Sequence, residues 1–192
     1  MDKLREPGLI SNLMKPIRFL RAMIGFVPFM IYNRSSVCKP RVYGFFQALR
    51  TSASTSNMKI GAAGFCWGGK YAVLLTHDTP SSRASVSGSE PLKRLIDASF
   101  TAHPSWLNIP QDITPVSVPL AIGVGDSDSA FAYKDVLKTK NILEQKENCE
   151  VVIYPGAMHG FATRANPGDE KQKIMSGEVE EQAITWFRRW FD

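Results

Sequence analysis

The sequence predicts an α/β fold, with a mostly parallel sheet and helices on both of its faces. Short apolar runs without charge, such as residues 118–124, alternate with longer runs of helical periodicity. Such nearly continuous apolar strands are typical of parallel sheets that are covered on both faces. The 192 residues, 44% hydrophobic and 21% charged, suit one globular domain. We therefore expect a single domain over residues 1–192, made of a basic lid-like segment (1–39) and a core (40–192).

The first half of the core predicts a helix, a strand and a second helix. Pro40 can begin a helix, and apolar residues then recur on one face through residue 51. Residues 51–57 form a small polar loop. The apolar run 59–64 predicts a strand, and after a glycine-rich turn residues 70–76 have helical character.

The second half repeats the alternation of strands and helices. Residues 81–91 predict a loop rich in Ser, Gly and Pro, without core-forming residues beyond Val86. A helix is expected over 131–145, and an amphipathic helix over 179–191 closes the chain. The remaining apolar runs of strand length are 96–102, 118–124 and 151–154.

The distribution of charge argues against nucleic acid as a partner. The net charge is +5, but residues 1–50 hold nine Lys and Arg against two Asp and Glu. The other residues are close to neutral and carry no nucleic-acid-binding motif. The apolar run 19–32 contains Arg21 and Pro28 and is shorter than the roughly 20 residues of a membrane span. We interpret it as a buried or lid helix and expect neither a membrane span nor a signal peptide.

Three cysteines, Cys38, Cys66 and Cys149, are widely spaced along the chain. Their number is odd, and neither a C-x-x-C motif nor a Cys/His cluster of metal spacing occurs, so we predict neither disulfides nor a metal site. A reducing compartment, the cytoplasm, fits this pattern. Cys38 and Cys149 are interpreted as inert.

The segment Gly64–Gly68, GFCWG, has the form of a nucleophile elbow, in which a strand turns sharply into a helix. Side chains at Gly64 and Gly68 are expected to collide where strand and helix approach each other. The helix N-terminus would favour the Cys66 thiolate, and the backbone N–H of Trp67 would face a developing oxyanion. The simpler alternative makes Cys66 a small buried residue in a glycine-rich turn.

Two later loops supply the partners that a nucleophile of this kind needs. Asp126 and Asp128 follow one predicted strand, and His159 follows the next, in the chain order nucleophile, acid, histidine. Asp128 is the preferred acid because it lies farther past the strand end, with Asp126 as the alternative. His103 ends a strand run, where it either lines the pocket or is a loop histidine with satisfied hydrogen bonds.

Four motifs together resemble the dienelactone hydrolase family of the α/β-hydrolase superfamily, over about residues 40–192. They are GFCWGGKYAVLL at 64–75, AHPS at 102–105, GDSD at 125–128 and YPGAMHGFATR at 154–164. The resemblance implies a carboxylic ester hydrolase of the carboxymethylenebutenolidase type, acting on a small ester or lactone without metal or organic cofactor. It also implies a triad of Cys66, His159 and Asp128.

The resemblance has two further implications. An arginine shortly after the histidine binds the substrate carboxylate in the family, and Arg164 is the nearest match, with His103 lining the pocket. The family also carries early strands and a loop with a second oxyanion amide, for which this sequence shows no counterpart before Cys66. We therefore expect a sheet without its N-terminal strands, self-association through the exposed edge, and weak activity.

Two other functions compete with hydrolysis. A hydrolase fold without catalysis would serve as a binding or regulatory module. Alternatively, Cys66 would act as a redox-sensing thiol, since an exposed thiolate of low pKa oxidises readily. Reaction of Cys66 with an activated ester separates these possibilities.

Overall fold

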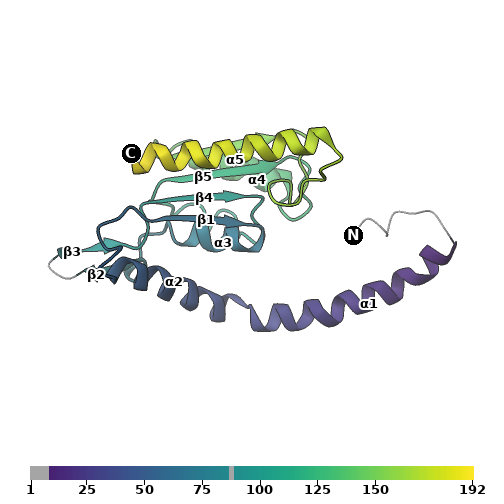
Figure 1. Ribbon diagram of the computed structural model, residues 1–192, viewed down its shortest axis with the longest axis horizontal. Helices are drawn as coiled ribbons and strands as arrows, with labels where there is room; N and C mark the ends of the chain where they lie inside the picture. Colours follow the sequence, from purple (N-terminus) through teal and green to yellow (C-terminus); the bar gives the residue numbers. More distant parts are fainter. Residues whose placement is uncertain (1–8, 87–88) are drawn as a thin grey trace. The chain divides into compact units, whose positions relative to one another are not determined.

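A computed structural model describes residues 9–86 and 89–192 of the chain (Figure 1). The chain divides into two compact units, Met1–Arg41 and Val42–Asp192. The second unit contains the four-stranded sheet and every predicted site residue.

The sheet of the second unit has four parallel strands in the order β1-β4-β5-β6. Each strand starts within two residues of an apolar run that the sequence predicts. The strands are β1 (Gly61–Phe65), β4 (Ala98–Ala102), β5 (Leu120–Gly125) and β6 (Cys149–Tyr154). Residues of β4 and β5 are buried throughout, as expected for strands covered on both faces.

Helices cover both faces of this sheet, which confirms the predicted fold class. In Figure 1, α5 (Glu170–Phe191) lies on one face and α3 (Trp67–Leu74) on the other. The side chains of β5 alternate accordingly: Leu120 and Ile122 join the core that includes Val73 of α3, while Ala121 packs in the core beneath α5. Helix α4 (Tyr133–Leu143) buries Val136 and Leu143 in the same core as Val73.

Two helices begin five or more residues before the predicted start. Helix α2 (Ser35–Thr51) begins five residues before Pro40, which lies inside the helix. A proline there removes one backbone hydrogen bond without preventing the first turn from forming. Helix α5 begins at Glu170, because the Asp169 carboxylate accepts a hydrogen bond from the Gln172 N–H (3.2 Å) and caps the helix nine residues before the predicted start.

The predicted loop at 81–91 is the main error in the secondary structure. It contains a short 3₁₀ turn (Pro80–Ser82) and the strands β2 (Arg83–Val86) and β3 (Ser89–Arg94), which pair antiparallel. Ala84 and Val86 are both buried, so the inward face is apolar although small residues hide the alternation in the sequence.

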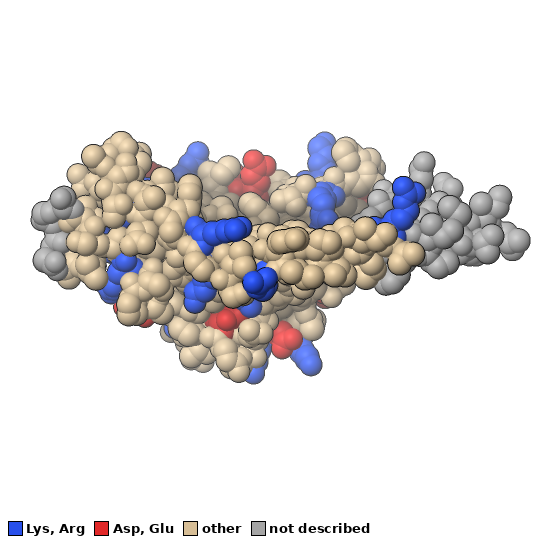
Figure 2. Space-filling model, turned by 90° about the horizontal axis from the view of Figure 1, so that it is seen from below, with Lys and Arg blue, Asp and Glu red and all other residues tan. Residues whose placement is uncertain are grey.

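The described part of the first unit is dominated by α1 (Leu9–Tyr32). The run 19–32 is helical as predicted, and within this unit its described large side chains are exposed. They are Leu20, Ile24, Phe26, Val27, Phe29, Met30, Ile31 and Tyr32, from 37% to 72% exposed. Apart from a short turn, the described residues of this unit form helix only, and Figure 2 shows a long, largely uncharged surface with Lys and Arg at its margins. Among the described residues, no helix combines the length and apolar character needed to cross a membrane.

Candidate functional site

Cys66 stands alone between the end of β1 at Phe65 and the start of α3 at Trp67. Its backbone has φ 52° and ψ −123°, a strained conformation that L-residues rarely adopt. The strand therefore turns into the helix within one residue, as the GFCWG motif predicts. The turn leaves the Cys66 side chain partly exposed, at the carboxyl edge of the parallel sheet.

The glycines around Cys66 have different roles. A Cβ at Gly64 would lie 2.6 Å from the Gly68 carbonyl oxygen and 2.8 Å from Ala72 Cβ, which confirms the expected collision. A Cβ at Gly68 would meet nothing within 4 Å, so the collision expected there is absent. The second close approach is at Gly69 instead, where a Cβ would overlap Thr101 Oγ1 and lie 2.9 Å from Pro104 Cβ. The helix turns Gly68 outward and Gly69 toward β4.

His159 joins Cys66 to an acid. Its Nε2 lies 3.0 Å from Cys66 Sγ, and its Nδ1 lies 2.9 and 3.0 Å from the two carboxylate oxygens of Asp128. The Asp128 side chain is fully buried, and it also accepts a hydrogen bond from the Ala130 N–H (2.7 Å). The sequence-predicted residues Cys66, Asp128 and His159 thus form one hydrogen-bonded chain.

Asp126 is directed elsewhere. Its Oδ1 accepts hydrogen bonds from the Gly156 N–H (2.7 Å) and from the Ser127 hydroxyl (3.0 Å). The side chain thereby ties the loop after β5 to the loop after β6. Asp126 therefore bonds the backbone of the loops, as a loop aspartate commonly does, and not His159.

The contacts shift the pKa values of the two reacting groups in opposite directions. Burial alone would raise the pKa of the Cys66 thiol. Hydrogen bonds of the sulfur with Ser105, His159 and the Trp67 N–H outweigh burial, so the pKa of this thiol is lowered. Burial would lower the pKa of His159, but the hydrogen bonds with Cys66 and Asp128 and their charges raise it. Both shifts favour a thiolate beside an imidazolium.

Ser105 is a site residue that the sequence reasoning did not single out. Its Oγ lies 3.5 Å from Cys66 Sγ and 3.5 Å from His159 Nε2, and the side chain is buried. Its backbone N–H donates to the Cys66 carbonyl (2.9 Å), which joins the loop after β4 to the elbow. The signal was present, because the AHPS motif follows a strand whose end meets the elbow.

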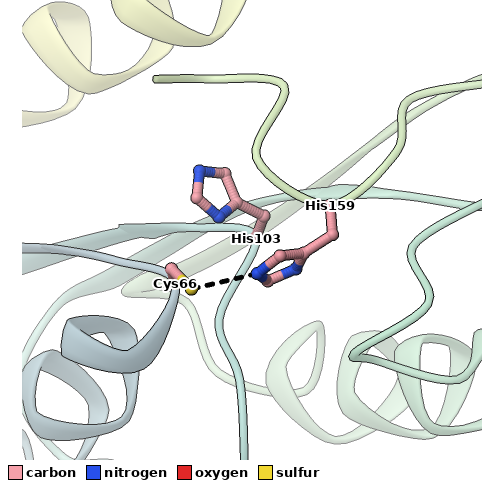
Figure 3. A group of neighbouring side chains, drawn as sticks. All are labelled: Cys66, His103 and His159. Carbon is pink, nitrogen blue, oxygen red and sulfur yellow. Dashed lines mark hydrogen bonds between the residues drawn. The ribbon is translucent and has the colours of Figure 1, made fainter. Parts of the chain in front are cut away.

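His103 lies behind the pair of Cys66 and His159. The side chain is completely buried at φ 39°, and its ring centroid is 5.1 Å from that of His159 (Figure 3). Burial, assisted by the charge of His159, lowers the pKa of His103 to about 4, so the ring is neutral at pH 7. Its Nε2 lies 3.5 Å from Thr163 Oγ1. His103 is therefore packed against the site, where it cannot meet solvent.

One cavity borders His159, and another borders the elbow. A cavity of about 150 Å³ is lined by His159, Met158 and the exposed Arg164. A larger apolar cavity of about 330 Å³ lies between α2, β1 and α3, and Trp67 and Phe46 are among its lining residues. Arg164 thus borders His159, and the Trp67 indole packs edge-on against Tyr71.

The other thiols and the third histidine lie outside this group. Cys38 is buried, and its Sγ is 3.8 Å from Asn33 Oδ1. Burial raises the pKa of Cys149, which fits an inert thiol. His77 Nε2 pairs with the Asp112 carbonyl (2.8 Å).

A parallel sheet covered on both faces, with a strained cysteine between strand and helix, defines an α/β-hydrolase-like protein. The pattern of the Dienelactone hydrolase family matches residues 30–191, and the chain belongs to this family. The resemblance found in the sequence is therefore confirmed.

Comparisons with individual proteins agree with this class. The chain is 26% identical over 133 residues to hydrolase pyvD of Aspergillus violaceofuscus, covering 69% of this chain and 48% of the relative. It is 30% identical over 135 residues to hydrolase tropI of Talaromyces stipitatus, covering 69% and 46%. The chain thus spans about half the length of these relatives. Esterase 2 of Thermogutta terrifontis shares the fold, with a TM-score of 0.58 at 17% identity over 77% of this chain and 63% of the esterase.

Proposed function

We propose that this chain carries the reacting centre of a hydrolase that cleaves a small ester or lactone through a cysteine acyl-enzyme. The observation that carries the proposal is the line of contacts from Cys66 Sγ to His159 Nε2 (3.0 Å) and from His159 Nδ1 to Asp128 (2.9 Å). Membership of the dienelactone hydrolase family supports the substrate class. The strained elbow supports Cys66 as the attacking group.

In the first half of the reaction, the Cys66 thiolate attacks the carbonyl carbon and forms a C–S bond. The carbonyl oxygen becomes an oxyanion, toward which the Trp67 backbone N–H donates. When the C–O bond of the ester breaks, the leaving alkoxide takes the proton from His159 Nε2. Asp128 holds the imidazolium in position and balances its charge.

In the second half, neutral His159 removes a proton from water, and the hydroxide attacks the thioester. The C–S bond breaks, the acid product leaves, and the Cys66 thiolate faces the imidazolium again. A lactone opens by the same steps and yields a single hydroxy acid. Ser105 Oγ, 3.5 Å from both reacting atoms, is placed to stabilise the thiolate between turnovers.

The substrate of this proposal is small and carries an anionic group. The cavity beside His159 measures about 150 Å³ and is lined by residues of the loop after β6 and of α5. Arg164 lines that cavity and would pair with a carboxylate of the substrate. We therefore expect Arg164→Gln to raise KM for acidic lactones more than KM for neutral esters of similar size.

The test is to treat the protein with p-nitrophenyl acetate and to measure both nitrophenol release and protein mass. A burst of one nitrophenol per chain, with one acetyl group on the peptide containing Cys66, supports the proposal. Cys66→Ala abolishes the burst, whereas the matched variant Cys149→Ala keeps it. A folded protein that takes up no acyl group would be a binding module, and an acetyl group on another residue would reject Cys66 as the nucleophile.

A further inference from the structure

Cys66, His103 and His159 bring three metal-ligating atoms together at the elbow. Cys66 Sγ and one nitrogen from each imidazole all lie within 4.8 Å of one another. These residues are 37 and 56 positions apart in the sequence, so their spacing gives no metal-binding motif. Only the fold assembles them, from the turn after β1 and the loops after β4 and β6.

One of the three groups has a nitrogen without a partner. His103 is completely buried, and its Nδ1 makes no hydrogen bond. Figure 3 shows this nitrogen, next to the ring carbon that carries the side chain, on the side facing Cys66 and His159. A buried polar atom without a partner is costly, and binding an electron-pair acceptor would satisfy it.

The surroundings suit a metal ligand set. Asp128 accepts from His159 Nδ1 at 2.9 Å, which is the support that a carboxylate commonly gives to a metal-binding histidine. It leaves Nε2 as the coordinating nitrogen. The Ser105 hydroxyl, 3.5 Å from both Cys66 Sγ and His159 Nε2, adds a polar atom beside a fourth position.

We propose that Cys66 Sγ, His159 Nε2 and His103 Nδ1 bind one Zn²⁺ ion, with a water at the fourth position near Ser105. One thiolate and two imidazoles are typical zinc ligands, and three protein ligands leave one position open. In a tetrahedral site with Zn–S of about 2.3 Å and Zn–N of about 2.0 Å, the ligand atoms are about 3.3–3.5 Å apart. The 3.0 Å contact of Cys66 with His159 must open slightly and any wider pair must close, which rotations of the side chains can achieve.

Binding has a defined chemical consequence. Zn²⁺ replaces the proton shared by Cys66 Sγ and His159 Nε2, and that proton passes to the solvent. The sulfur electron pair is then in the Zn–S bond and is unavailable for attack on a carbonyl. Zinc therefore blocks the reaction of the thiol reversibly. Metal binding itself needs no substrate, so its test is independent of the proposed hydrolysis.

The first experiment titrates the reduced protein with Zn²⁺ against a chromophoric chelator, and with Co²⁺ as a spectroscopic substitute. We expect one ion per chain and, for Co²⁺, a thiolate charge-transfer band. His103→Asn lowers the Zn²⁺ affinity at least tenfold, and Cys66→Ser removes the band. His77→Gln and Cys149→Ser are the matched controls, because they alter the remaining histidine and another thiol. Both the Zn²⁺ affinity and the Co²⁺ band should stay unchanged in these two variants.

The second experiment needs no variant and applies even if His103→Asn does not fold. In protein with ¹⁵N-labelled histidine, Zn²⁺ should shift Nδ1 of His103 and Nε2 of His159 and leave His77 unchanged. A wild-type protein that shows no saturable binding overturns the proposal. So does an unchanged His103 resonance, or a folded His103→Asn variant with wild-type affinity.

Discussion

At the scale of single residues, the site depends on how burial and hydrogen bonds divide protons between a thiol and an imidazole. Cys66 and Cys149 are both partly buried, yet the pKa of Cys66 is lowered and that of Cys149 is raised. The difference comes from the partners of Cys66: His159, the Ser105 hydroxyl and the Trp67 N–H. The hydrogen-bond partners at the elbow, and not burial alone, decide the direction in which the pKa of this thiol is shifted.

This difference predicts how alkylation depends on pH. A lowered thiol pKa means that Cys66 stays a thiolate as the pH falls, whereas Cys149 becomes protonated already at high pH. The ratio of the Cys66 rate to the Cys149 rate with iodoacetamide should therefore be higher at pH 7 than at pH 10. Peptide-resolved mass spectrometry measures both rates in one sample. Equal rates at pH 7 in the folded protein would contradict an activated Cys66.

The two aspartates give a matched pair for the acid. Asp128→Asn should lower kcat for ester cleavage by at least about a hundredfold, because an amide neither orients His159 correctly nor balances its charge. Asp126→Asn should change kcat less than about fivefold, since an amide oxygen can still accept from the Gly156 N–H. Steady-state kinetics on one ester decides. If only the Asp126 variant loses most of its activity, the acid is Asp126 and the assignment to Asp128 is wrong.

His103 predicts a loss of stability in mild acid. Its pKa is about 4 in the folded protein, below the ordinary 6.5, so the unfolded chain binds a proton that the folded chain excludes. His103 contributes at most about 3 kcal/mol to the free energy of unfolding. This contribution is present above pH 6.5 and is lost as the pH falls from 6.5 to 4. Urea unfolding at several pH values measures it. Over this range the free energy of unfolding should fall less steeply with decreasing pH in His103→Asn than in the wild type. Equal slopes in the two proteins would contradict the prediction.

At the scale of elements, the contact of β1 with α3 positions Cys66. The strand and helix approach so closely at Gly64 that a Cβ would press on the Gly68 carbonyl and on Ala72. At Gly69, α3 comes similarly close to Thr101 of β4 and to Pro104, which follows β4. The strained backbone of Cys66 is maintained because packing on both of its sides fixes the directions of strand and helix.

Gly64 and Gly68 therefore respond differently to the same substitution. Gly64→Ala should lower the free energy of unfolding by about 1–3 kcal/mol, since backbone and packed atoms must move. Gly68→Ala should leave it unchanged or raise it by up to about 1 kcal/mol, because alanine favours the helix and the site is open. Urea unfolding of the two variants is the measurement. A destabilised Gly68→Ala would show that the two segments meet there after all.

At the scale of the whole molecule, the described sheet ends on one side at β1. The Cys66 N–H donates a hydrogen bond to the Ala102 carbonyl of β4. Successive residues of a strand point their N–H groups to opposite sides, so those of Ala63 and Phe65 point away from β4, to the unpaired edge of β1. Ala63 is exposed there, and an unpaired strand edge can pair with another chain. The exposed apolar side chains of α1 offer a second route to association.

These two routes can be separated. We expect the chain to self-associate through β1, so that Ala63→Lys lowers the associated fraction, since a charge at a strand edge opposes pairing. The exposed turn variant Ala53→Lys serves as the control and should have no effect. Sedimentation over a range of concentrations measures the fraction. If Ile24→Lys in α1 abolishes association and Ala63→Lys does not, the edge is not the contact.

The sequence by itself determined the alternation of strands and helices, because apolar periodicity is local. It also indicated the motifs whose residues meet at the elbow, since a turn of this kind needs small residues beside its central residue. It did not reveal the strands at 83–94, because burial depends on what packs against a segment. Only the tertiary structure placed Asp128 on His159, Asp126 on Gly156, and Ser105 and His103 beside Cys66. These contacts join residues far apart in the chain, and only the parallel sheet brings the loops that carry them to one edge.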